Sequence, residues 1–152
     1  MTPVYFDNAA TTAIRPEVVT AISESLSEQY GNPSSTHSFG RSAKALIEKA
    51  RKSIATTLGA KPSEIYFTSG GTEADNMVLR CAVRDLGVKR IITSAIEHHA
   101  VLHAAEAVAE EYGIVLELVD IDQQGFIDLK DLENKLSLES APKTLVSLMH
   151  VN

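Results

Sequence analysis

Cysteine, tryptophan and long apolar runs are what this sequence has least of. Its one cysteine, Cys81, cannot form an intrachain disulfide, which indicates a reducing, cytoplasmic setting. No apolar run approaches the length that spans a bilayer, and no basic segment followed by an apolar one opens the chain. Neither a membrane partner nor a secretory signal is therefore expected. Cys81 lies among apolar residues in a helical pattern and is expected to be a buried, inert thiol.

Positive charge is also scarce. The 152 residues carry 14 Lys and Arg against 20 Asp and Glu, for a net charge of −6. This balance argues against a nucleic-acid partner, because such a surface needs clustered basic side chains to displace counterions from phosphates. What is present is a hydrophobic fraction of 44%, which is enough for a core in a chain of ordinary domain size.

Hydrophobic periodicity indicates the fold class. Two helices are expected first, one beginning near Pro16 and one over 38–58 that ends at Gly59. Apolar runs and helical patterns then alternate, with strands over 64–68, 90–94, 114–121 and 144–151 and helices over 72–87, 98–113 and 128–136. This order predicts an α/β fold of three layers, in which a mostly parallel sheet carries helices on both faces.

A glycine pair stands between the first expected strand and the following helix, in the stretch TSGGTEADN at residues 68–76. Gly70 and Gly71 leave the backbone N–H groups uncovered, and the first N–H groups of a helix lack internal partners. With a capping box of Thr72 and Asp75, this turn predicts a site for an anion, most naturally a phosphate. The alternative is a tight turn with glycines for steric reasons. Neither a nucleotide P-loop nor a dinucleotide fingerprint is present.

Histidines follow the next expected strand, at the same edge of the sheet as the glycine turn. His98 lies nearest the strand end, where an imidazole can stack on a planar ligand or move protons. A rival interpretation is a metal site from His99 and His103, four residues apart, with Glu106 near the same face. Spacing alone favours capping or surface roles for His99 and His103, and His98 is the better functional candidate.

A third pattern resembles a calcium-binding loop and supplies a hypothesis from outside enzymology. Six residues fall on the ligand and turn positions of an EF-hand: Asp120, Asp122, Gln124, Gly125, Asp128 and Asp131. The last position holds Asp where a bidentate Glu is needed, and the preceding segment is β-like where an EF-hand needs a helix. A polar turn that leads into the next helix is the simpler interpretation.

Several stretches together resemble one known family. VYFDNAATT, YGNPSSTHSFG, EIYFTSGGTEADN, ITSAIEHHAVL, GFIDLKDLE and LVSLMHVN occur in family order, with family-like spacing, from about residue 4 onward. The chain resembles the N-terminal part of a cysteine desulfurase, a pyridoxal-phosphate (PLP) enzyme of fold type I and of the class-V aminotransferases. The resemblance implies that residues 1–152 are a single, incomplete N-terminal portion of the PLP-binding large domain, with residues 1–15 as an extended arm.

The resemblance also assigns residues to the cofactor. Gly71 and Thr72 match the positions that contact the PLP phosphate, in agreement with the anion site derived above. His98 matches the histidine that stacks on the pyridine ring and assists proton transfer, so it is the expected catalytic residue. The Schiff-base lysine, the aspartate that pairs with the pyridine nitrogen and the sulfur-accepting cysteine have no counterparts here, and Cys81 lies far from the position of that cysteine. The fragment alone is therefore expected to be inactive.

The implied reaction converts L-cysteine to L-alanine and leaves the sulfur on the enzyme as a persulfide. The resemblance implies a homodimer, with sulfur-acceptor or scaffold proteins of iron–sulfur cluster assembly as partners. A selenocysteine lyase or another class-V aminotransferase-like enzyme remains an alternative, because the residues that would distinguish them lie outside this sequence. A truncated partner that only dimerises is a further one.

Overall fold

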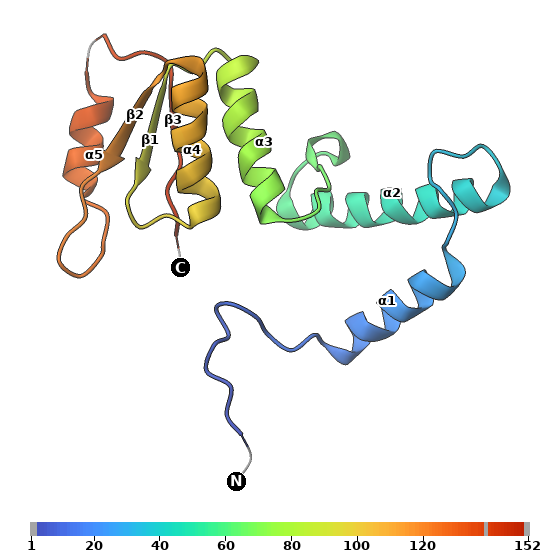
Figure 1. Ribbon diagram of the computed structural model, residues 1–152. Helices are drawn as coiled ribbons and strands as arrows, with labels where there is room; N and C mark the ends of the chain where they lie inside the picture. The colour runs from blue at the N-terminus through green and yellow to red at the C-terminus, as the bar shows by residue number, and fades with distance from the viewer. Residues whose placement is uncertain (1–2, 139, 151–152) are drawn as a thin grey trace. The chain divides into compact units, whose positions relative to one another are not determined.

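The computed structural model describes residues 3–138 and 140–150. The chain divides into two compact units, Met1–Phe67 and Thr68–Asn152, each of which is described by itself. Figure 1 traces the helices and strands of both units. Among the described residues, no helix combines the length and the apolar character needed to cross a bilayer.

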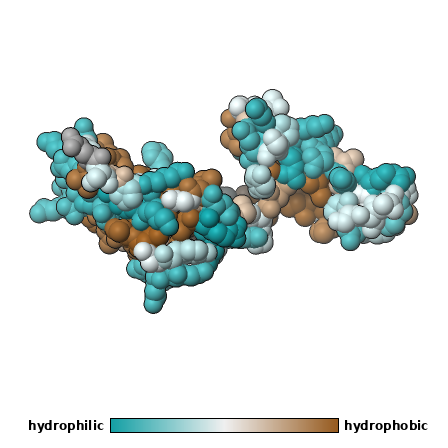
Figure 2. Space-filling view, turned by 90° about the horizontal axis from the view of Figure 1, so that it is seen from above, coloured by the Kyte–Doolittle hydropathy of each residue, from teal (hydrophilic) through white to brown (hydrophobic). Residues whose placement is uncertain are grey.

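The first unit is helical. Residues 3–15 contain a turn but no helix or strand. Helix α1 (Pro16–Glu28) begins at its proline, and α2 (Ser38–Leu58) ends where Gly59 adopts φ 65°, as a left-handed cap should. Both predicted helices are confirmed. The apolar residues of α1 nevertheless remain exposed, with Leu26 77% accessible. Figure 2 shows apolar side chains on the surface.

The predicted strand over 64–68 is wrong. Glu64 instead closes a short 3₁₀ helix, η1 (Pro62–Glu64), and its carboxylate accepts a hydrogen bond from the Lys61 N–H at 2.7 Å. Arg51 of α2 donates to the Ile65 carbonyl and places its guanidinium 4.8 Å from the centre of the Phe67 ring. None of the three strands in the described part of the chain pairs with this segment. A β-prone run without a ladder partner stays an extended connection.

The second unit is an α/β structure. In chain order it contains α3 (Gly71–Arg84), β1 (Arg90–Ser94), α4 (His99–Tyr112), β2 (Val115–Val119), α5 (Leu129–Leu136) and β3 (Thr144–Val146). The three strands are parallel in the order β2-β1-β3. The predicted fold class is confirmed. The expected strand over 144–151 is shorter than predicted, and its residue 151 lies outside the described part of the chain.

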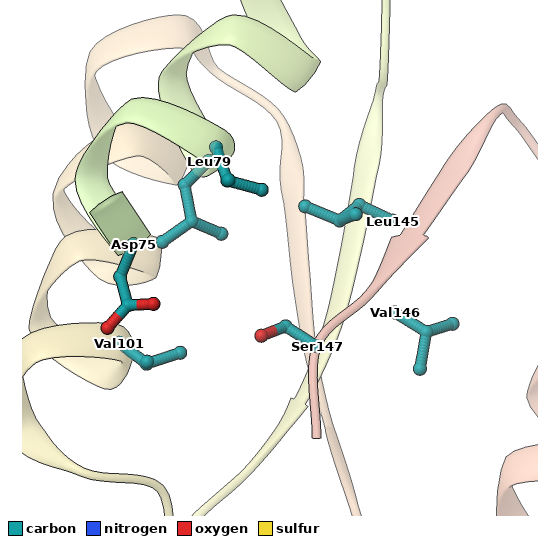
Figure 3. A pocket seen from close by; sticks show the side chains of 7 residues that line it. Asp75, Leu79, Val101, Leu145, Val146 and Ser147 are labelled. Carbon is teal, nitrogen blue, oxygen red and sulfur yellow. The ribbon is translucent and has the colours of Figure 1, made fainter. Parts of the chain in front are cut away.

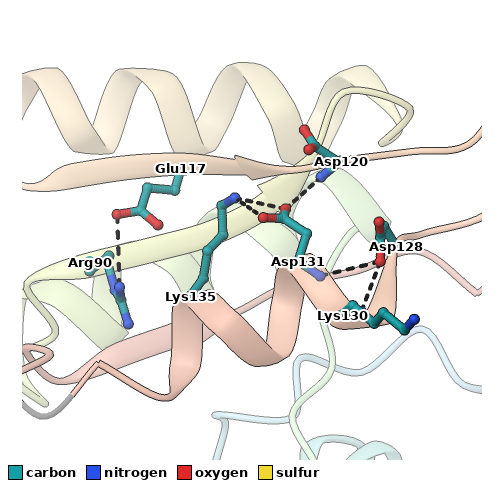
Figure 4. Close-up of polar contacts among 7 residues, drawn as sticks. All are labelled: Arg90, Glu117, Asp120, Asp128, Lys130, Asp131 and Lys135. Carbon is teal, nitrogen blue, oxygen red and sulfur yellow. Dashed lines mark hydrogen bonds and ion pairs between the residues drawn. The ribbon is translucent and has the colours of Figure 1, made fainter.

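The two faces of the sheet carry different layers. Ile91 of β1 stands beside Leu116 and Leu145 in the register, and all three pack against the buried side chains of α3 and α4, such as Leu79 and Val108. Arg90 and Glu117 point to the opposite face, because side chains alternate along a strand. Figure 4 shows these two residues on the side of α5. One face therefore holds the main apolar core, and the other combines buried apolar side chains such as Ile92 and Val119 with a polar layer around Arg90.

That polar layer is organised by the buried Arg90. Its Nε donates to the Thr144 hydroxyl at 2.9 Å, and its Nη1 lies 3.8 Å from the Glu117 carboxylate. These contacts join the first residues of β1 and β3 to the middle of β2.

Candidate functional site

The strand order marks one edge of the sheet as a place for a ligand. From β1 the chain moves to β2 on one side, and from β2 it returns past β1 to β3 on the other. The direction of winding therefore reverses between β1 and β3. In open parallel sheets such a reversal leaves a crevice outside the carboxyl ends of the strands, and ligands bind there. The segments that leave β1 and β3 are the ones that carry His98 and His150.

The glycine turn presents uncovered amides. Gly70 is the N-cap of α3, and the first intrahelical bond runs from the Ala74 N–H to the Gly70 carbonyl at 3.1 Å. The N–H groups of Gly71 and Thr72 precede that bond and point out of the helix end, where the dipole is positive. A Cβ added at Gly70 or Gly71 would meet no atom within 4 Å. The two glycines therefore lie in an open part of the turn.

The predicted capping box of Thr72 and Asp75 is wrong, because the helix begins earlier than expected. With Gly70 as N-cap, the third helical position falls on Glu73. Its carboxylate accepts hydrogen bonds from the Ser69 N–H at 2.6 Å and from the Ser69 hydroxyl at 2.7 Å. The hydroxyl and then the amide lower the pKa of Glu73 below its ordinary value of 4.5. The Glu73 carboxylate therefore stabilises the turn through Ser69.

His98 is fixed by its own helix. It is the N-cap of α4, which begins at His99 and not at His98 as predicted, and its Nδ1 accepts a hydrogen bond from the Ala100 N–H at 3.1 Å. A neutral imidazole whose Nδ1 is an acceptor carries its proton on Nε2. The side chain is exposed. Its ring can therefore meet a planar ligand while Nε2 donates a proton.

The helix N-termini that carry the glycine turn and the histidine loop lie side by side. Thr72 and Asn76 of α3 and His99, Ala100 and His103 of α4 line one groove of about 270 Å³. Figure 1 shows the starts of α3 and α4 at the same end of the unit as the carboxyl ends of β1 and β3. The starts of α3 and α4 therefore form one rim, whose groove is lined by Thr72 and by His99 and Ala100, the two residues that follow His98.

A smaller cavity lies behind this rim, between α3, α4 and β3 (Figure 3). Its volume is about 120 Å³, and apolar side chains such as Leu79, Val101 and Leu145 line much of it. Asp75 and Ser147 contribute its polar atoms. Ligand pockets are typically about 300–1,000 Å³. The cavity is therefore too small to hold a cofactor-sized ligand by itself.

Metal binding finds no support in the geometry. The rings of His99 and His103 lie 5.0 Å apart, but residues 3–138 and 140–150 contain no group of three or more ligating side chains that could hold a metal. Their imidazoles remain surface groups of α4, as spacing alone suggested.

The calcium-loop hypothesis is wrong for a different reason, which Figure 4 shows. Asp131 accepts a hydrogen bond from the Asp120 N–H at 2.9 Å. Nζ of Lys135 donates to both of its carboxylate oxygens, at 2.5 and 2.7 Å. Asp128 caps α5 through the Lys130 N–H at 2.8 Å. The segment before the loop is strand β2, not a helix. These carboxylates are engaged in separate local contacts and do not converge on a cation.

Two residues of the second unit depart from expectation. Cys81 is half-buried rather than buried, and its sulfur lies 3.8 Å from Nη2 of Arg84. Glu97 received no role from the sequence, yet it is only 8% exposed and accepts a hydrogen bond from the Met149 N–H at 2.6 Å. The sequence signal for Glu97 was present: an acidic residue in the short loop between a buried strand and a helix.

Comparison with known proteins assigns the whole described chain to one family. The profile of the family described as Aminotransferase class-V matches residues 4–152. The chain is 45% identical to "Cysteine desulfurase IscS" of Dictyoglomus turgidum over 151 residues, and 45% identical to "Cysteine desulfurase IscS" of Methanosarcina thermophila over 152 residues. Each alignment covers 98% of this chain, and the chain spans 37% and 36% of the lengths of those relatives.

Solved structures agree with the sequence relatives. One titled "NIFS-LIKE PROTEIN" superposes with a TM-score of 0.86 at 37% identity, over 98% of this chain and 40% of that one. A second, titled "SspA in complex with cysteine", gives a TM-score of 0.82 at 34% identity, over 97% of this chain and 42% of that one. Fold and sequence thus point to the same relatives.

Proposed function

The chain belongs to the aminotransferase class-V family, and from this premise we propose that it forms the cofactor-phosphate-binding part of a PLP-dependent cysteine desulfurase. The observation that carries the proposal is the rim formed by the starts of α3 and α4, whose groove is lined by Thr72, His99 and Ala100, the neighbours in sequence of Gly71 and His98. That rim offers a positive helix end for a phosphate dianion and, next to it, a flat ring for an aromatic heterocycle.

The residues of the rim divide the work between them. The N–H groups of Gly71 and Thr72, with the Thr72 hydroxyl, would hold the phosphate at the start of α3. His98 would face the pyridine ring and keep a proton available at Nε2, because Nδ1 is occupied by the Ala100 N–H. The cofactor, when bound, supplies the electron sink, and the protein supplies orientation and proton transfer.

The substrate class follows from the relatives. Those compared above bear the name cysteine desulfurase, and one similar protein was solved in complex with cysteine. We therefore place L-cysteine as the substrate, L-alanine as the product and a protein persulfide as the carrier of sulfur for iron–sulfur cluster assembly. The groups that bond covalently to cofactor and sulfur, and the homodimer contacts, belong in this proposal to the part of the relatives that this chain does not span. The 152 residues alone then bind the phosphate group without desulfurating cysteine.

Titration with pyridoxine 5′-phosphate tests the proposal. This analogue keeps the phosphate and the ring but has no aldehyde, so it cannot react with surface lysines. In two-dimensional NMR of the 152-residue chain, we expect saturable shifts at the Gly71 and Thr72 amides. The His98 ring protons should move upfield, because they would lie over the face of the ligand.

Pyridoxine without the phosphate is the matched control and should bind far more weakly. Equal binding of both compounds would contradict the phosphate role of the glycine turn. Shifts confined to lysine-rich surfaces, with Gly71 and His98 unmoved, would contradict the site itself.

A further inference from the structure

Glu97 is a buried carboxylate between the ends of β1 and β3. Its residue exposure is 8%, and its Oε1 accepts one hydrogen bond from the Ser94 hydroxyl at 3.3 Å and another from the Met149 N–H at 2.6 Å. Ser94 is the last residue of β1, whereas Met149 lies 52 residues after Glu97 and follows β3. One side chain therefore connects the exits of two neighbouring strands.

These contacts continue the sheet beyond its backbone ladder. Strand β3 ends at Val146, and the Ser147 N–H still donates to the Ile92 carbonyl at 2.9 Å. Past that bond, the Met149 N–H has left the ladder and is taken up by Glu97. The carboxylate thus closes the crevice between β1 and β3 at its base, at the point where the winding of the sheet reverses.

The environment explains how a carboxylate can be buried here. Glu97 directly precedes the N-cap of α4, where the helix dipole favours negative charge. A bond from a backbone N–H to a carboxylate is charge-assisted and shorter than a neutral one, in keeping with the 2.6 Å distance to Met149. The cost of burying the Glu97 carboxylate is therefore offset by hydrogen bonds from the Ser94 hydroxyl and the Met149 N–H.

We propose that Glu97 is a positioning residue that holds His98 in place against the segment following β3. Glu97 anchors the loop on its sheet side through Met149, and the Ala100 N–H fixes the ring of His98 on its helix side. With both sides held, the imidazole keeps one orientation and one tautomer before any ligand arrives. The importance of that orientation for the cofactor rests on the proposed function, whereas the anchoring itself does not.

Three variants of the 152-residue chain test this role. Glu97→Ala removes the acceptor, Glu97→Gln keeps an acceptor oxygen without the charge, and Glu106→Ala removes an exposed carboxylate further along α4 as the matched control. Two quantities are measured by NMR: the hydrogen-exchange rate of the Met149 amide, and the ¹⁵N shifts of the His98 ring, which report its tautomer. Exchange at the Val108 amide reports whether the core stays folded.

In Glu97→Ala we expect Met149 to exchange about 10- to 100-fold faster, the range for loss of a bond to a charged group. The His98 shifts should move from a single Nε2–H tautomer toward an average of both. In Glu97→Gln the increase at Met149 should be about two- to tenfold, because a neutral bond is weaker, and His98 should keep its tautomer. Glu106→Ala should change neither quantity.

The proposal is overturned if neither Glu97 variant accelerates exchange at Met149. It is equally overturned if Glu97→Ala accelerates that exchange while His98 keeps its tautomer, since the anchor would then not position the ring. If Val108 shows that Glu97→Ala has unfolded, the rate at Met149 in Glu97→Gln decides. No measurement here involves the cofactor, so a failure of pyridoxine 5′-phosphate to bind would count against the proposed function alone.

Discussion

Replacing Gly71 by alanine separates what the glycine does for the fold from what it does for a ligand. Gly71 is the first residue of α3 and has no positive φ, and a Cβ there would meet nothing within 4 Å. At such a position alanine mainly restricts the unfolded chain, which stabilises the folded state by about 0.4–1 kcal/mol. For a unit of the size of Thr68–Asn152, this corresponds to a rise in Tm of about 2–8 °C.

The same methyl group should damage anion binding. It stands in the space through which a phosphate has to approach the Gly71 and Thr72 amides, and each such bond to a charged group is worth about 1.5–3 kcal/mol. We expect the Kd for pyridoxine 5′-phosphate to rise about tenfold or more in Gly71→Ala. Thermal denaturation followed by circular dichroism gives the first quantity, and NMR titration gives the second.

Gly113→Ala is the matched control in the same unit. Gly113 also has no neighbour within 4 Å of an added Cβ, but its φ is +61° at the C-cap of α4. Alanine there should destabilise the fold by about 1 kcal/mol and leave ligand affinity unchanged. The reasoning would be refuted if Gly71→Ala lowered the Tm, or if it raised the Tm without weakening binding.

Three further predictions follow from the same unit. Glu73→Gln should lower stability at neutral pH, because the Ser69 hydroxyl and amide hold the pKa of Glu73 below its ordinary value of 4.5. The difference from wild type should shrink as the pH falls below about 4.5 and be lost once the pH passes the lowered pKa, and a pH-independent difference in denaturation midpoint would contradict this assignment. Leu79→Ala should destabilise the unit by about 2–5 kcal/mol, because Leu79 is 2% exposed in the core, whereas Leu86→Ala at 62% exposure should change the free energy of unfolding by less than about 0.5 kcal/mol; similar urea midpoints for the two would contradict the assigned core. Millimolar calcium should leave the Tm unchanged, because Lys135 and the Asp120 N–H already occupy Asp131, and a calcium-dependent rise that Asp131→Asn abolishes would restore the calcium hypothesis.

Much of the second unit could be predicted from periodicity. Strand β1 matches its predicted range, and α3, α4 and α5 lie within a few residues of theirs, since each has an apolar face and an identifiable end. The strand predicted over 64–68 was wrong because β-prone residues only favour an extended backbone, whereas a strand also requires a neighbouring strand to pair with. In the described chain that neighbour is not among the three strands of the sheet.

The open glycine turn could be predicted from the sequence, its anchoring carboxylates could not, and phosphate binding at the turn stays a prediction. Gly70 and Gly71 indicate a turn with uncovered backbone amides, because two consecutive residues without side chains stand directly before a helix. Glu73 and Glu97 act through contacts with Ser69 and Met149, and the second contact joins residues far apart in sequence. No local pattern encodes which distant N–H a carboxylate will meet, so such a residue emerges only from the folded structure.

The separation between β1 and β3 has a kinetic consequence. Pairing Arg90 with Thr144 closes a loop of 54 residues, whereas β1 meets β2 across a single helix. Loop closure becomes entropically harder as the loop lengthens, so we expect β1, α4 and β2 to assemble first and β3 to dock last. The crevice at the end of β1 would then form only in that last step of folding.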